Sequence, residues 1–223
     1  MAIDQVQVAL TGPGMTQENT PGFLRTGSYG ELIVQPLFGK YAELTRRGYV
    51  YAARSAAAAT IPVNTTLTNS PTLWNKASSG KLVYLLQVLF SPAAIGTPVI
   101  SGLTLSWLKN TGDGVGTGAP IVTFTNVAPN PCLIGRGACS TAWAPATDTF
   151  TTQPAALMDL GLGYWLSGTA ATGSQITYIF DFDGTVVMPP GTSVSIGSAT
   201  AATSVTYWTT LIFAELPLPA LWT

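Results

Sequence analysis

The chain has 223 residues, of which 47% are hydrophobic and only 9% are charged, and its formal net charge is −1. This length allows one domain with a substantial core. The low charge density excludes disorder driven by charge repulsion, and it excludes the dense Lys/Arg stripes of nucleic-acid-binding proteins. Because so few charges protect a free monomer poorly against association, we expect other subunits to cover much of the surface.

Two features argue against a leader sequence and a membrane anchor. Residues 1–5 lack the basic and apolar regions of a signal peptide. The longest apolar run, residues 82–90, is about half as long as a membrane-spanning helix. We therefore expect synthesis in a cytoplasm and no membrane partner.

Residues 11–30 differ in composition from the rest of the chain. They contain two prolines and five glycines, which disfavour a regular helix or strand. One interpretation is a flexible terminus, and the other is an arm that becomes ordered against a neighbouring molecule. The side chains that would make this contact are Phe23, Leu24, Arg25 and Tyr29. We divide the chain into an N-terminal arm, residues 1–30, and a single β domain, residues 31–223.

Taken in chain order, the sequence is a series of short apolar, β-branched runs separated by clusters of Gly, Pro, Asn and Ser. This pattern predicts an all-β fold. The expected strands are residues 6–10, 31–37, 41–45, 48–53, 81–90, 103–109, 121–126, 163–166, 176–182, 193–196 and 204–215. Residues 46–48, Arg-Arg-Gly, lie between two of these strands and predict a hairpin turn in which Gly48 has a positive φ.

The last expected strand, residues 204–215, is largely apolar or neutral on both faces. A strand with two such faces fits a sandwich whose outer face meets a neighbouring subunit. The large side chains Tyr207, Trp208 and Phe213 are therefore candidates for a subunit contact, and a homotrimer is the expected assembly.

Residues 178–187, YIFDFDGTVV, match the Asp-x-Asp-Gly-Thr motif of haloacid dehalogenase-like phosphatases. In that family the motif follows the first strand, and later strands supply a lysine and further acids around phosphate and magnesium. Here Glu215 is the only charged residue after Asp183. We interpret the motif as a strand that turns at Asp183 and Gly184, where Asp and Gly are favoured.

The chain contains no histidine. His-based triads and His metal ligands are therefore excluded, and we expect no enzymatic activity, no metal and no cofactor. Cys132 and Cys139 flank a glycine-containing loop. A short disulfide-closed loop and two free thiols both remain open, because the expected cytoplasm favours thiols while a particle released from its cell would meet oxidants.

A longer resemblance is carried by residues 27–53, GSYGELIVQPLFGKYAELTRRGYVYAA, and residues 73–86, LWNKASSGKLVYLL. Together they resemble structural proteins encoded among the head genes of tailed bacteriophages. A weaker similarity extends to the Glu-Leu-Pro that ends the last expected strand. The resemblance implies a β-sandwich or jelly roll of the virion, commonly trimeric, and it carries over no catalytic residue.

We therefore expect a capsid decoration protein that binds the major capsid protein of a phage head and becomes part of the virion. The rival expectation is a receptor-binding or carbohydrate-binding head of a tail fibre or spike. In that case exposed aromatic side chains in loops would stack on sugars. The candidates for stacking are Trp74, Trp143, Tyr164 and Trp165.

Overall fold

The computed structural model describes residues 39–55, 58, 61, 72–94, 101–109, 121–127, 129–135, 144–150, 152, 154–163, 177–198 and 206–218. The compact unit that contains the β-sheets begins at Leu44. The N-terminal arm, 1–30, and the expected strands 6–10 and 31–37 lie outside the described residues.

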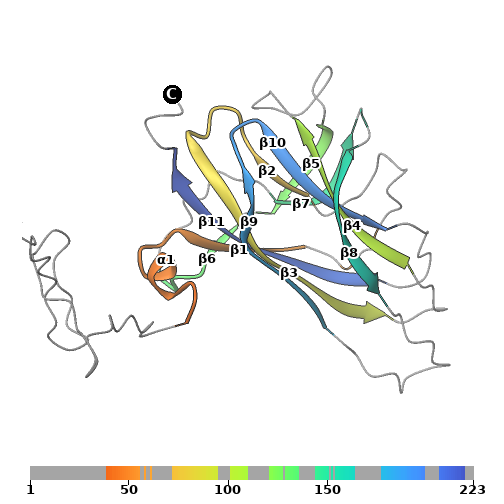
Figure 1. Ribbon diagram of the computed structural model, residues 1–223, viewed down its shortest axis with the longest axis horizontal. Helices are drawn as coiled ribbons and strands as arrows, with labels where there is room; N and C mark the ends of the chain where they lie inside the picture. The colour runs from red at the N-terminus through yellow and green to blue at the C-terminus, as the bar shows by residue number, and fades with distance from the viewer. Residues whose placement is uncertain are drawn as a thin grey trace, which may run out of the picture. The chain divides into compact units, whose positions relative to one another are not determined.

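The described residues form one short helix and eleven strands (Figure 1). The helix is α1 (Ala42–Arg46). The strands are β1 (Val50–Arg54), β2 (Thr72–Asn75), β3 (Lys81–Ala94), β4 (Ser101–Lys109), β5 (Ile121–Val127), β6 (Asn130–Pro131), β7 (Ala144–Phe150), β8 (Ala155–Gly163), β9 (Tyr178–Met188), β10 (Thr192–Ser198) and β11 (Thr206–Pro217).

Two antiparallel sheets pack against each other. The first has the strand order β6-β1-β11-β3-β9 and the second the order β2-β10-β4-β8. Strands β5 and β7 form a separate two-stranded sheet. The expectation of an all-β sandwich is confirmed.

The pairing of strands is that of a jelly roll. Without β5, β6 and β7, eight strands remain, and each strand of the first half pairs antiparallel with its counterpart counted from the end of the chain: β1 with β11, β2 with β10, β3 with β9 and β4 with β8. Such pairing arises when one long antiparallel ribbon wraps around a core, so that successive strand pairs alternate between the two sheets. The hairpin β5–β7 is an insertion between β4 and β8, and β6 extends the first sheet beside β1.

The core lies between the two sheets and is almost entirely apolar. Leu85, Phe90 and Phe213 from the first sheet, and Leu103 and Leu105 from the second, are fully buried. Phe213 stacks on Tyr51 with ring centroids 5.9 Å apart, and Phe90 meets Tyr207 edge-on at 6.3 Å. These aromatic contacts hold β1, β11 and β3 in one layer.

The expected strand 41–45 is wrong, because these residues begin helix α1. Ala, Glu, Leu and Arg favour a helix, and Glu43 in the first turn and Arg46 in the last complement its dipole. Gly48 has the expected positive φ, 76°, but it ends the helix instead of closing a hairpin. The Gly48 amide donates to Thr45 O at 2.8 Å and the Tyr49 amide to Leu44 O at 2.9 Å, which is the Schellman pattern of a helix C-terminus.

The remaining expected strands in the described residues correspond to β1, β3, β4, β5, β9, β10 and β11, with ends that differ by a few residues. Of the expected strand 163–166, the structure describes only Gly163, the last residue of β8. Strands β2, β6, β7 and most of β8 were not expected from the sequence. Their residues include Thr, Asn, Pro, Asp and Gly, which are poor indicators of a strand unless neighbouring strands provide the pairing.

Candidate interaction surface

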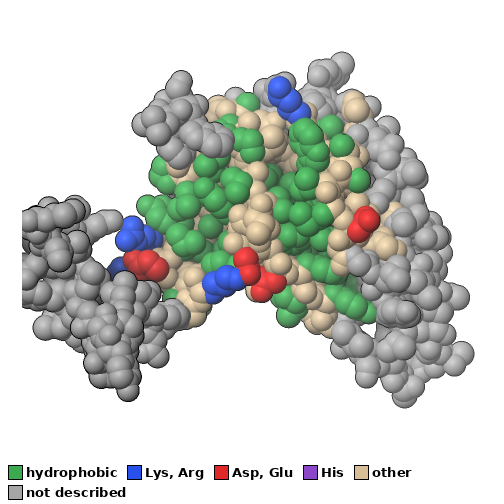
Figure 2. Space-filling view, in the orientation of Figure 1, with side chains coloured by type: hydrophobic (Ala, Val, Ile, Leu, Met, Phe, Trp, Pro, Cys, Tyr) green, Lys and Arg blue, Asp and Glu red, His purple; other side chains and the backbone are tan. Residues whose placement is uncertain are grey.

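The candidate site in this sandwich is a surface for contact with another molecule. Figure 2 shows hydrophobic side chains over much of the visible surface of the described residues, with Lys, Arg, Asp and Glu side chains at a few separate places. In that part of the chain, no group of three or more Cys, Asp or Glu side chains could hold a metal ion. No helix among the described residues is long and apolar enough to cross a membrane.

The largest candidate surface is the side of the first sheet that faces away from the core, which we call the outer face. Strand alternation assigns it, because the intervening residues of each strand belong to the core. Its principal side chains are Arg54 of β1, Trp208, Thr210 and Ile212 of β11, Tyr84, Gln87 and Leu89 of β3, and Ile179, Asp181 and Val187 of β9.

Strand register arranges these side chains in rows across the sheet. One row is Arg54, Thr210, Leu89 and Ile179; the next is Ala52, Ile212, Gln87 and Asp181; the third is Val50, Ala214, Tyr84 and Val187. Ile179 is 59% exposed and Val187 is 41% exposed. These two exposed aliphatic side chains, with the half-buried Ile212 and Leu89 on neighbouring strands, make the outer face the candidate contact surface.

The positively charged side chain of Arg54 lies on the outer face. The Arg54 guanidinium lies 4.0 Å from the centroid of the Trp208 ring, a distance typical of a cation–π contact. The contact orients the Arg54 side chain over β11 while leaving the residue exposed. Arg54 therefore adds a positive charge to an otherwise apolar part of the outer face.

The Asp-x-Asp-Gly-Thr motif lies within β9, and the strand does not end there as expected. Asp183 and Gly184 have φ values of 53° and 80°, as a type I′ turn requires at its two central residues. The Thr185 hydroxyl donates to Phe182 O at 2.7 Å and closes this turn. Register resumes beyond it at Val186, so the motif forms a bulge of several residues opposite Leu86.

The positive φ of Gly184 leads to a prediction. A Cβ at this position would lie 3.7 Å from the Tyr84 side chain, which is an ordinary contact, so backbone strain decides the cost of a substitution. We expect Gly184→Ala to lower the free energy of unfolding by about 1 kcal/mol, measured by urea denaturation. Asp183→Gly, which relieves the positive φ in the same turn but also removes the Asp183 side chain, should cost less than Gly184→Ala; equal losses in both variants would contradict this account of the bulge.

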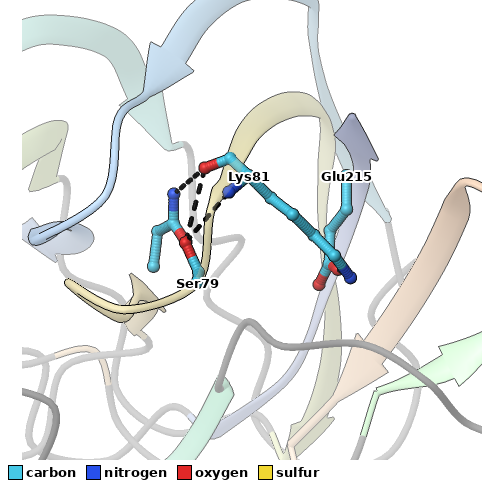
Figure 3. A network of polar contacts seen from close by, with 4 residues as sticks. Ser79, Lys81 and Glu215 are labelled. Atoms are coloured by element: carbon cyan, nitrogen blue, oxygen red, sulfur yellow. Dashed lines mark hydrogen bonds and ion pairs between the residues drawn. The ribbon is translucent and has the colours of Figure 1, made fainter. Parts of the chain in front are cut away.

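A polar network joins the β2–β3 connection to the last strand (Figure 3). Glu215 of β11 is buried, with a side chain only 1% exposed, and the Lys81 ammonium donates to its carboxylate at 2.8 Å. The buried Asn75 donates through its amide to Lys81 O at 2.8 Å and to Met188 O at 2.9 Å. Ser79 bonds to the Lys81 backbone, and Gly80 has a φ of 62°.

This network contains several of the residues within 73–86 that the sequence pattern singled out. The Asn-x-x-x-Ser-Gly-Lys stretch is the turn between β2 and β3, and its lysine binds the glutamate of the Glu-Leu-Pro ending. Asn75 also ties this turn to the end of β9. The network therefore joins the β2–β3 turn, β9 and β11 at one end of the sandwich.

The structure divides the three expected subunit-contact residues between the two faces of β11. Tyr207 and Phe213 are 1% and 0% exposed and belong to the core, so their side chains cannot reach a second copy. Trp208 lies on the outer face and remains a candidate. The sequence showed the alternation but not which of the two apolar faces is turned inward.

Burial also affects two weak acids. It raises the pKa of the Tyr207 phenol, and the charge of neighbouring Tyr178 raises that pKa further. Burial likewise raises the pKa of the Cys132 thiol. Both groups therefore stay protonated at neutral pH, which gives neither of them the charge of an activated nucleophile.

Other expected site residues fall in different places. Cys132 is a free thiol beside β6, and Cys139 lies outside the described residues. Trp74 is not in a loop: it is a fully buried residue of β2, packed with Phe150 and Leu108. The remaining candidates, Phe23, Leu24, Arg25, Tyr29, Trp143, Tyr164 and Trp165, lie outside the described residues.

Sequence reasoning missed several exposed apolar residues. Ile179 and Val187 were assigned to a strand but not to a surface. Ile134, 97% exposed in the turn after β6, and Trp107, 43% exposed on β4, were not singled out. Only the alternation of Ile179 and Asp181 with the aromatic residues of β9 could have indicated an outer face.

Comparison of the chain with known protein families, with curated proteins and with solved structures gave no match.

Proposed function

We propose that the protein is a structural protein of a virus particle, a decoration protein that binds the outside of a tailed-phage head as an oligomer. The observation that carries the proposal is a jelly roll whose first sheet turns a sparsely charged face, with the exposed Ile179 and Val187, away from the core. Such a face serves contact between proteins. The major capsid protein and further copies of this chain are the partners.

Two further observations support this proposal. Jelly rolls are common in viral capsid proteins, although the fold also occurs in lectins and cupins and does not define a function by itself. The motifs that resemble phage head proteins form a stabilising junction around Asn75, Lys81 and Glu215.

The experiment is reconstitution on empty phage heads that lack this protein. Heads incubated with increasing concentrations of purified protein are sedimented, and the bound protein is counted per head. We expect saturable binding at many regularly spaced copies, visible by electron microscopy of the decorated heads. Absence of binding, or binding only at the tail, would overturn the proposal.

The same experiment tests the N-terminal arm. A variant without residues 1–26 is expected to keep its circular dichroism spectrum and oligomeric state but to need a higher concentration to saturate the heads, because avidity multiplies a modest contact from each copy. If this variant saturates the heads at the wild-type concentration, Phe23, Leu24 and Arg25 do not contribute to the docking contact.

The alternative function is a receptor-binding or carbohydrate-binding head of a tail fibre. The observation that favours it is Trp107, whose side chain is 43% exposed and therefore available for stacking on a sugar ring. Binding of the purified protein to host cells or to a glycan array, lost in Trp107→Ala and absent from phage heads, would favour this alternative.

A further inference from the structure

We propose that the outer face is a two-fold contact between two copies of this chain, in which Arg54 of each copy lies against Asp181 of the other. The proposal rests on the proposed function and deepens it, because it assigns a surface through which copies associate; a two-fold contact builds a dimer and not the homotrimer expected from the sequence. It commits to a second copy as the occupant of the face.

The first argument is the apolar centre of the face. Ile212 and Leu89 occupy neighbouring strands in the middle of the sheet and are half-buried, while Ile179 on β9 is 59% exposed. Water contact with these side chains is unfavourable in proportion to their apolar area. A second apolar sheet face placed on top would remove that area from water, as in the packing of two sheets in a sandwich.

The second argument is the placement of charge. Arg54 is at the end of β1, and Asp181 is on the edge strand β9, with β11 and β3 between them. Three strand spacings separate β1 from β9 by about 14 Å, which is too far for an ion pair within the chain. Among the described residues, neither the Arg54 guanidinium nor the Asp181 carboxylate makes an ion pair.

A surface with this charge pattern is complementary to itself. In a two-fold contact, if residue i of one copy touches residue j of the other, then j touches i as well. A cation on one side of the face and an anion on the other therefore form two ion pairs per dimer. A face with charges of one sign would instead repel its copy.

The face is small for an interface. Four strands at about 4.8 Å spacing and three rows about 6.8 Å apart, less the positions of the buried Val50 and Ala214, cover on the order of 300 Å² per copy, less than half of what one partner of a standard interface buries. An area this small is typical of weak, transient contacts. We therefore expect a dimer that forms in the micromolar range and not a permanent one. Copies held side by side on a larger assembly would associate more firmly through avidity.

The test is a charge exchange in the full chain. The wild type, Arg54→Glu, Asp181→Arg and the double variant are compared by sedimentation velocity over a range of micromolar concentrations at low salt. Both residues are exposed, so each variant should fold, which circular dichroism checks. Lys109→Glu, an exposed charge change on the second sheet, is the matched control.

We expect the wild type and the Lys109 variant to dimerise alike. Each single exchange should weaken dimerisation on the order of tenfold, because it places like charges together twice per dimer, and the double variant should recover most of that loss. A double variant no better than the single ones would overturn the pairing of Arg54 with Asp181. A wild type that stays monomeric, or forms a trimer without dimers, would overturn the two-fold contact while leaving head binding to be decided by reconstitution.

A second measurement gives direct proximity. Arg54→Cys and Asp181→Cys chains, each with both native cysteines replaced by serine, are mixed and oxidised under mild conditions. The proposal predicts a disulfide between the two kinds of chain, formed faster than between two Asp181→Cys chains. Equal rates for both pairs would count against the contact.

Discussion

Replacing Phe213 with alanine is expected to lower the free energy of unfolding by about 3–5 kcal/mol, the usual cost of removing a buried aromatic side chain. Phe213 is 0% exposed, and its ring stacks on Tyr51 between the sheets. The loss therefore combines apolar area returned to water with a cavity that neighbouring strands cannot close. Urea denaturation followed by circular dichroism measures it.

Trp208→Ala is the matched control on the same strand. Its side chain lies on the outer face and packs on Arg54, so its removal should cost about 1 kcal/mol or less. The two variants should also differ in sedimentation velocity experiments. Trp208→Ala should weaken self-association, and the folded Phe213→Ala variant should not. A Phe213→Ala variant that is stable but monomeric would be the reverse pattern. It would show that Phe213 belongs to the subunit contact and would contradict its position in the core.

Lys81→Met is expected to lower the free energy of unfolding by about 3 kcal/mol. It removes the cation that lies 2.8 Å from the Glu215 carboxylate and leaves that charge in a buried position. Breaking a buried pair from one side costs about 3–5 kcal/mol, and the value should fall at the lower end because the Lys81 side chain is 29% exposed to water. Chemical denaturation at neutral pH measures the change.

The double variant Lys81→Met, Glu215→Leu distinguishes the loss of the ion pair from the cost of leaving Glu215 as an unpaired buried charge. Since both charges are then absent, it should recover most of the lost stability. Lys109→Met, which removes an exposed lysine, should change stability by less than about 0.5 kcal/mol. A double variant as unstable as Lys81→Met would show that the lost stability does not come from leaving Glu215 unpaired.

The sequence alone determined the fold class and most of the strands, because strand residues alternate and turn residues punctuate them. Residues 204–215 show this best: the alternation of Tyr207, Thr209 and Leu211 with Trp208, Thr210 and Ile212 is the pattern of β11. The positive φ of Gly48 and Gly184 was likewise visible from residue type. These properties are local, and each follows from a few neighbouring residues.

The helix α1 shows the limit of local pattern. Residues 41–45 alternate well enough for a strand, yet two backbone hydrogen bonds to Leu44 and Thr45 close a helix end at Gly48. The helix-favouring residues of α1 contribute little over five positions, so its conformation also depends on the hydrogen bonds that end it at Gly48. Strand β2 depends on tertiary pairing in the same way, because β10 is its one partner among the described strands.

The candidate surface was decided by tertiary structure alone. With both sides of β11 apolar, the sequence could not say whether Phe213 or Trp208 faces the core, and a shift by one residue exchanges the two faces. Pairing with β1 and β3, and packing against the second sheet, places Phe213 inside and Trp208 outside. The same pairing places Arg54 and Asp181, 127 positions apart in the sequence, on one face with β11 and β3 between their strands, because residues distant in the chain share a face only when strands are assembled into a sheet.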